Sequence, residues 1–162
     1  MKKPLNLQVN GQAHEILVEP SETLNSVLRK RLRLTGTKRA CDTGGCGSCT
    51  VLLDGKAVYS CMTYALSIDG HSVTTIEGLS IGNVLHPIQE AFVTKGALQC
   101  GFCTPGLIMT AKAVLDANPN PTDDELREGL AGNLCRCTGY VKIFEAIKEA
   151  GRELTRRKRH DV

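Results

Sequence analysis

The sequence predicts an α+β protein in which a strand-rich half precedes an all-helical half. In the first half, the dipeptides Asn10-Gly11 and Asp54-Gly55 stand between apolar runs and are the turn residues that β-hairpins prefer. Residues 77–83 have the composition of a linker, and beyond them apolar residues recur at helical spacing behind proline-led starts. We therefore expect two domains, residues 1–78 and residues 79–162.

The first domain is expected to contain two hairpins, one helix and a final strand. The alternating segment 5–9 pairs, through the first turn, with residues 14–19. Residues 23–32 place leucine and valine at helical spacing. The second hairpin spans residues 50–58, and residues 71–76 form the last strand. Together these elements indicate a small mixed sheet packed on a helix.

The second domain is expected to contain four helices. The first begins at Pro87, and the second begins at Thr104-Pro105, with the threonine as its N-cap, and is stopped by the Asn-Pro repeat at 118–121. Thr122-x-x-Glu125 has the pattern of a capping box for the third helix. The fourth covers residues 139–151, where apolar side chains again follow helical spacing.

Composition favours a cytoplasmic protein without a membrane span. The chain has 162 residues, a formal charge of +3 and no stretch near the ~18 apolar residues of a membrane span. No apolar segment follows the lysines at the start, so no secretory signal is visible. The basic run near the end is expected to be a solvated, frayed terminus that binds no nucleic acid; it comprises Arg156, Arg157, Lys158 and Arg159.

Eight cysteines in a cytoplasmic chain favour metal or redox chemistry over disulfides. The first four have the spacing C-x4-C-x2-C with a fourth cysteine after eleven residues, which is the plant-ferredoxin spacing for a 2Fe–2S cluster. Glycines between them let a short loop wrap around the cluster and bring backbone N–H groups near the sulfurs. These residues are Cys41, Cys46, Cys49 and Cys61, with Gly44, Gly45 and Gly47.

The other four cysteines form a second complete set in the helical half. They are Cys100, Cys103, Cys135 and Cys137. Each pair directly precedes a predicted helix start, where the helix dipole and free N–H groups should lower thiol pKa values. Four thiolates also bind structural zinc, so zinc remains an alternative to an iron–sulfur cluster for both sets.

Three motifs, "CDTGGCGSCTV", "QCGFCTPG" and "GNLCRCTGY", together resemble those of the small iron–sulfur subunit of the molybdenum hydroxylases, the xanthine dehydrogenase and aldehyde oxidoreductase superfamily. The resemblance covers residues 5–150. It implies a ferredoxin-like β-grasp domain followed by a four-helix domain, each holding one 2Fe–2S cluster. All eight cysteines occupy the positions of cluster ligands in that family.

The resemblance also implies partners. A large subunit would bind molybdopterin and the substrate, and a medium subunit would often bind FAD, in a dimer of heterotrimers. Electrons would pass from molybdenum through the helical-domain cluster and then the ferredoxin-like cluster to the flavin or another acceptor. In the family, residues at the positions of Gln99 and Cys137 hydrogen-bond the pterin. No catalytic residue or substrate site is expected in this chain.

Two other functions remain open from the sequence. One is a zinc-stabilised binding or scaffold module, and the other is a free-standing ferredoxin. A plain ferredoxin needs no helical domain, which favours the electron-transfer subunit. The motifs do not specify the substrate of such a complex, which could be a purine, an aldehyde, carbon monoxide, an N-heterocycle or an aromatic thioester.

Overall fold

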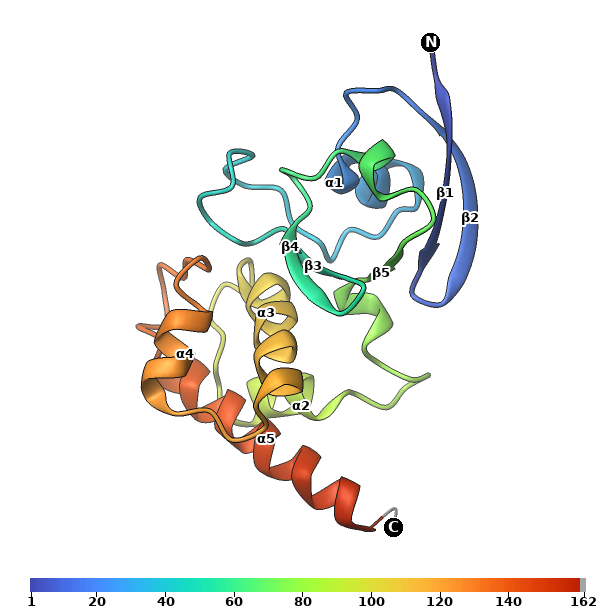
Figure 1. The fold of residues 1–162 in the computed structure, drawn as a ribbon. Coiled ribbons are helices and arrows are strands. Elements are labelled where there is room, and N and C mark those ends of the chain that lie inside the picture. The colour runs from blue at the N-terminus through green and yellow to red at the C-terminus, as the bar shows by residue number, and fades with distance from the viewer. Residues whose placement is uncertain (161–162) are drawn as a thin grey trace.

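The computed structural model describes residues 1–160 and confirms the α+β class. Within those residues, a five-stranded sheet occupies the first half of the chain, and four helices of at least seven residues occupy the second (Figure 1). None of the described helices is long and apolar enough to cross a membrane.

The strands form one mixed sheet. They are β1 (Lys3–Val9), β2 (Gln12–Val18), β3 (Thr50–Leu53), β4 (Lys56–Tyr59) and β5 (Ser72–Thr74). The order across the sheet is β2-β1-β5-β3-β4. Both predicted hairpins are confirmed, and their turns have positive φ at both residues, as Asn-Gly and Asp-Gly turns require. β5 joins the hairpins by running parallel to β1 and antiparallel to β3.

The helix predicted over residues 23–32 is present but irregular. α1 (Leu24–Ser26) runs into a π-helical turn, η1 (Val27–Arg31). The buried Leu28 side chain packs in one core with strand residues such as Leu5. Two short 3₁₀ turns, η2 (Ala65–Ile68) and η3 (Ile76–Gly78), flank β5.

The helical half packs around a second core. Its helices are α2 (Pro87–Thr94), α3 (Thr104–Ala117), α4 (Asp123–Gly129) and α5 (Val141–His160). The bulkiest core side chains are at most 1% exposed; they include Phe92, Leu107, Leu126, Ile143 and Ile147. Each half therefore has its own buried core, while the boundary predicted between residues 78 and 79 stays a prediction.

The helix starts are set by capping groups. The capping box of α4 is confirmed: the Glu125 N–H donates to the Thr122 hydroxyl at 3.3 Å, and the Thr122 N–H donates to the Glu125 carboxylate at 2.7 Å. At α2, His86 Nδ1 accepts from the Ile88 N–H at 3.2 Å. The prediction that Thr104 caps α3 is wrong, because Thr104 is already the first helical residue and the preceding cysteine takes the cap position.

The frayed basic terminus is also a wrong prediction, because α5 continues through that run to His160. Ion pairs along the helix explain the extension. Glu153 lies 2.8 Å from Arg156 and 2.7 Å from Arg157, one turn further on. Arg157 also reaches Glu90 of α2 at 3.9 Å. Residues 161 and 162 lie outside the described part of the chain.

The two halves pack directly on each other, with α3 beside β3 (Figure 1). Leu52 of β3 is buried in the core of the helical half. The Tyr59 hydroxyl, at the end of β4, donates to the Gly132 carbonyl at 3.0 Å. The cysteine-bearing loops of both halves therefore come together at one junction.

Candidate metal centres

The loop with the first three cysteines bends through left-handed backbone. Gly44 and Gly47 have φ of 78° and 69°, a conformation that glycine adopts without a Cβ clash. The Thr43 N–H lies 3.5 Å from the Cys41 sulfur. A backbone donor thus faces a sulfur as predicted, but it is the Thr43 N–H rather than that of one of the three glycines.

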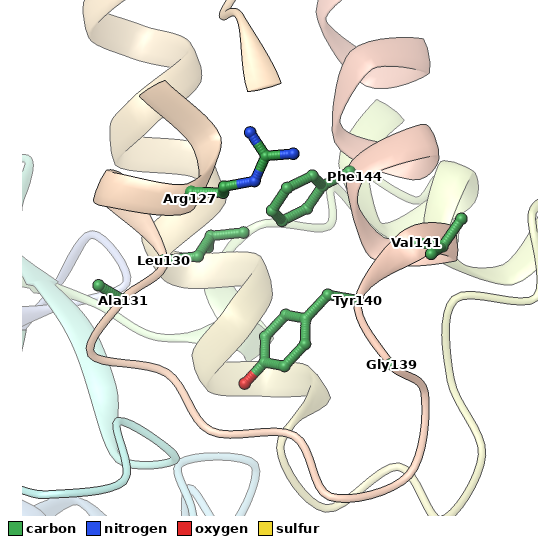
Figure 2. Close-up of a pocket in the computed structure, with 7 residues that line it drawn as sticks. All are labelled: Arg127, Leu130, Ala131, Gly139, Tyr140, Val141 and Phe144. Atoms are coloured by element: carbon green, nitrogen blue, oxygen red, sulfur yellow. The ribbon is translucent and has the colours of Figure 1, made fainter. Parts of the chain in front are cut away.

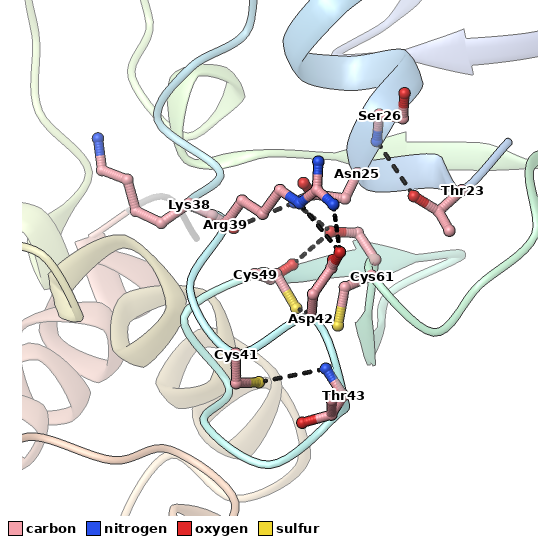
Figure 3. A network of polar contacts seen from close by, with 11 residues as sticks. Thr23, Asn25, Ser26, Lys38, Arg39, Cys41, Asp42, Thr43, Cys49 and Cys61 are labelled. Carbon is pink, nitrogen blue, oxygen red and sulfur yellow. Dashed lines mark hydrogen bonds and ion pairs between the residues drawn. The ribbon is translucent and has the colours of Figure 1, made fainter.

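The sulfurs of the first quartet lie in two pairs. Cys49 Sγ is 3.3 Å from Cys61 Sγ, and both side chains are buried. The Cys41 and Cys46 thiols are neighbours nearer the solvent. Figure 3 shows Cys49 and Cys61 next to each other and marks the contact from Thr43 to Cys41. Burial, followed by the negative charge of the nearby cysteine thiolates, raises the pKa of Tyr59.

A buried hydrogen-bond chain supports the inner pair (Figure 3). Asn25 Nδ2 donates to Ser60 Oγ and to the Lys38 carbonyl, each at 3.1 Å. The Ser60 hydroxyl in turn donates to the Cys49 carbonyl at 2.7 Å. The chain links α1 to both segments that carry buried cysteines, so it fixes where those sulfurs lie.

The thiols of this quartet differ in acidity. The Thr43 N–H, followed by the Cys46 thiol, lowers the pKa of Cys41 to about 6. Burial raises the pKa of Cys49 to about 11. Metal binding requires all ligating thiols as thiolates, so it must release a proton from Cys49.

The second quartet is also paired. Cys100 Sγ and Cys137 Sγ lie 3.7 Å apart on the exposed side. Cys103 and Cys135 are half-buried and are neighbours. The Thr138 N–H and hydroxyl approach the Cys135 sulfur at 3.4 and 3.0 Å.

The predicted lowering of the thiol pKa values at helix starts is wrong for two of these cysteines. Burial and the neighbouring Cys135 raise the pKa of Cys103 to about 12. The Cys100 thiol beside Cys137 raises the pKa of Cys137. At Cys135, burial opposes ionisation, but the hydrogen bonds from Thr138 outweigh it and the pKa is lowered. Burial at Cys103 and the neighbouring thiol at Cys137 therefore oppose ionisation, whereas hydrogen bonds favour it at Cys135.

The two residues predicted to contact a pterin lie together at the surface. Gln99 Nε2 donates to the Cys137 carbonyl at 3.1 Å. Both residues are exposed, as is Cys100. The structure therefore brings Gln99 and Cys137 to one edge beside the second quartet, and their role toward a pterin stays a prediction.

The paired sulfurs fit 2Fe–2S clusters, in which each iron takes two protein ligands. Two thiolates about 2.3 Å from one tetrahedral metal lie about 3.8 Å apart, close to the 3.3 and 3.7 Å found here. Within residues 1–160, no three cysteine, histidine or acidic side chains converge closely enough to hold a single ion. The donors are thiols throughout, with N–H groups facing two of the sulfurs.

A pocket of about 450 Å³ opens between α4 and α5, beside the "CRCTGY" loop (Figure 2). Tyr140 lines this pocket. Its hydroxyl donates to the Asn133 carbonyl at 2.7 Å and accepts a hydrogen bond from the Cys135 N–H, also at 2.7 Å. The lining of the pocket is mostly apolar, with the Arg127 guanidinium and the Tyr140 hydroxyl as polar side-chain groups; it consists of Arg127, Leu130, Ala131, Gly139, Tyr140, Val141 and Phe144. This set offers no nucleophile or carboxylate for catalysis.

Several supporting residues were missed from the sequence. Thr138 lies within the "CRCTGY" motif and could have been noticed as a donor near Cys135. Asn133 lies within the longer motif "GNLCRCTGY", but its partner Gly47 is 86 positions away and cannot be read from the motif. Asn25 and Tyr59 lie outside the three motifs, and their partners are also at separated positions in the chain.

Two family descriptions match consecutive parts of the chain. A "2Fe-2S iron-sulfur cluster binding domain" covers residues 7–72, and a "2Fe-2S binding domain" covers residues 75–148. Together they span most of the chain and assign one cluster-binding domain to each half.

Similar proteins cover nearly the same length. The chain is 49% identical to a probable xanthine dehydrogenase subunit of Bacillus subtilis (strain 168), over 94% of this chain and 88% of the relative. It is 51% identical to the nicotine 6-hydroxylase small subunit of Paenarthrobacter nicotinovorans, over 90% of this chain and 88% of the relative. A chain in the crystal structure of quinoline 2-oxidoreductase from Pseudomonas putida 86 superimposes with a TM-score of 0.92 at 46% identity, covering 96% of this chain and 97% of that one.

Proposed function

Because the chain belongs to the small iron–sulfur subunits of the xanthine dehydrogenase and aldehyde oxidoreductase family of molybdenum hydroxylases, we propose that its two cysteine quartets hold the two clusters through which it transfers electrons. Electron transfer within a multi-subunit oxidoreductase is the function of this family, and relatives are named as subunits of such enzymes. Two bound 2Fe–2S clusters supply the one-electron redox chemistry.

The observation that carries this proposal is the gathering of all eight cysteines into two paired quartets. Cys41, Cys46, Cys49 and Cys61 would hold one cluster, and Cys100, Cys103, Cys135 and Cys137 the other. The chain's own groups would orient the ligands: the Thr43 and Thr138 N–H groups donate to sulfur, and the Asn25–Ser60 chain holds the inner pair.

The exposed edge around the second quartet is proposed to face the molybdopterin-binding partner. Gln99, Cys100 and Cys137 reach the surface there. Apolar side chains flank them in the sequence and are largely uncovered in this chain, with Phe102 46% and Leu134 58% exposed. A large subunit that covers this edge would exclude water, and the Gln99 amide and the Cys137 backbone would be placed to hydrogen-bond the pterin.

The remaining assembly is proposed on the family pattern. A medium FAD-binding subunit or another acceptor would receive the electrons, and the complex would be a dimer of heterotrimers. The substrate would bind to the large subunit.

Metal analysis of the protein purified anaerobically with its partners tests the proposal. We expect about four iron and about four acid-labile sulfide per small subunit, with molybdenum and pterin in the same complex. Stoichiometric zinc with iron near zero would overturn the cluster assignment. A chain that is never found with a molybdopterin-binding partner in its own cell extract would overturn the proposed assembly.

A further inference from the structure

The segment 132–134 connects the two candidate centres. It leads directly into Cys135 and lies against the loop that carries Cys46 and Cys49. The carbonyl of Gly132, its first residue, accepts a hydrogen bond from the Tyr59 hydroxyl at 3.0 Å. The N–H of Leu134, its last residue, donates to the Cys46 carbonyl at 2.9 Å. The backbone before one ligand is therefore bonded to the backbone of another ligand in the opposite half.

Asn133, the middle residue of this segment, is the buried side chain of the junction. It is 3% exposed. Its Nδ2 donates to the Gly47 carbonyl at 3.0 Å and approaches Thr50 Oγ1 at 3.4 Å. Its Oδ1 accepts the Thr110 hydroxyl at 2.8 Å. The amide is thus satisfied at both ends, with one end held by α3 and the other reaching into the first cluster loop.

The backbone around the Asn133 side chain is closely packed. A Cβ added at Gly47 would overlap the Gly132 carbonyl and lie 2.6 Å from Asn133 Nδ2. A Cβ at Gly106 would overlap the Gly47 carbonyl, and one at Gly132 would overlap the Tyr59 hydroxyl. Three glycines from three segments therefore let the two cluster loops touch backbone to backbone around the Asn133 amide.

We propose that Asn133 is a positioning residue that sets the separation and relative orientation of the two clusters. The inference rests on the proposed function, since it requires a cluster in each quartet. Electron tunnelling and magnetic dipole coupling both weaken steeply with distance, so a small shift between the loops changes the coupling of the clusters. Asn133 precedes Leu134 and Cys135 in the chain, and its amide hydrogen-bonds Gly47, the residue after Cys46. A shift between the two cluster loops would begin at this contact.

Electron paramagnetic resonance of the reduced native complex tests this role. In Asn133→Ala, the iron content and the separate signal of each cluster should be retained. The splitting of these signals, which arises from magnetic coupling between the two reduced clusters, should be narrowed or lost. Thr110→Val removes only the hydroxyl that orients the amide, and it should change the splitting in the same direction by a smaller amount. Asn83→Ala, at an exposed position remote in sequence from both quartets, is the matched control and should retain the wild-type splitting.

The outcomes separate this inference from the proposed function. A wild-type protein without iron would overturn the proposed function itself. A wild-type protein with both clusters but no mutual splitting, or Asn133→Ala with both clusters and the wild-type splitting, would overturn the positioning role alone. If Asn133→Ala does not accumulate in folded form, the splitting measured in Thr110→Val tests the proposal instead. An unchanged splitting in that variant also overturns the positioning role.

Discussion

Replacing Gly47 with alanine should expose the close contact between the two halves. Gly47 has φ of 69° and an added Cβ would meet Asn133 Nδ2 at 2.6 Å as well as the Gly132 carbonyl. Gly11 has φ of 79° with nothing within 4 Å of an added Cβ. The two variants therefore share the backbone strain of a left-handed alanine, and only Gly47→Ala also overpacks the junction.

The expected difference follows from these two contributions. Left-handed strain costs about 1 kcal/mol at either position, and overpacking against backbone costs about 2 kcal/mol more at Gly47. For a domain of this size, about 1 kcal/mol lowers Tm by about 3 °C. We therefore expect Tm to fall by about 3 °C in Gly11→Ala and by about 9 °C in Gly47→Ala.

Thermal unfolding of the cluster-loaded chain, followed by circular dichroism, measures both shifts. Iron content measured beforehand ensures that variants with equal cluster loading are compared. Gly55→Ala, with φ of 80° and open space around the added Cβ, is a second control that should behave like Gly11→Ala. Equal Tm shifts in Gly47→Ala and Gly11→Ala would refute the reasoning, because the junction would then tolerate a methyl group.

Three further predictions follow from the site and the caps. Cys46→Ser should lower iron to about two per chain and remove only the signal of the first cluster, while Cys135→Ser should remove only the signal of the second; loss of both signals from a folded single variant would contradict the assignment. Gln99→Ala should retain both clusters and slow the reduction of the clusters by substrate about two- to tenfold, because it removes a hydrogen bond worth about 0.5–1.5 kcal/mol. Unaltered reduction rates in rapid-mixing experiments, with full molybdenum occupancy, would mean that Gln99 bonds only its own chain. Burial holds the pKa of His86 below its ordinary value of 6.5, and only the neutral ring accepts a hydrogen bond from the helix N–H. The contribution of this cap to stability should therefore be present above about pH 6.5 and be lost as pH falls through the lower pKa of the folded state. Tm against pH should therefore be flatter below pH 6.5 in His86→Asn than in the wild-type protein, and parallel curves would count against the cap.

Local patterns predicted most of the elements correctly. The hairpins follow from Asn10-Gly11 and Asp54-Gly55, because these dipeptides adopt positive φ readily and the flanking residues alternate. The capping box at Thr122 was equally visible, since both of its hydrogen bonds join residues three apart. The end of α5 was missed although the pairs of Glu153 with Arg156 and Arg157 are three and four residues apart and therefore visible in the sequence. Only the ion pair from Arg157 to Glu90 depends on how two helices pack.

The sequence by itself determined the number of cysteines, their division between the halves and the glycines that let the first loop turn. These are properties of spacing and of backbone freedom, and both are local. Only the tertiary structure decided that Cys49 lies against Cys61 and Cys100 against Cys137. It also decided that Asn133 reaches Gly47 across 86 positions of the chain. Long-range contacts of this kind arise when two cores pack on each other. The tertiary structure also decided the burial that raises the pKa of Cys49 and of Cys103.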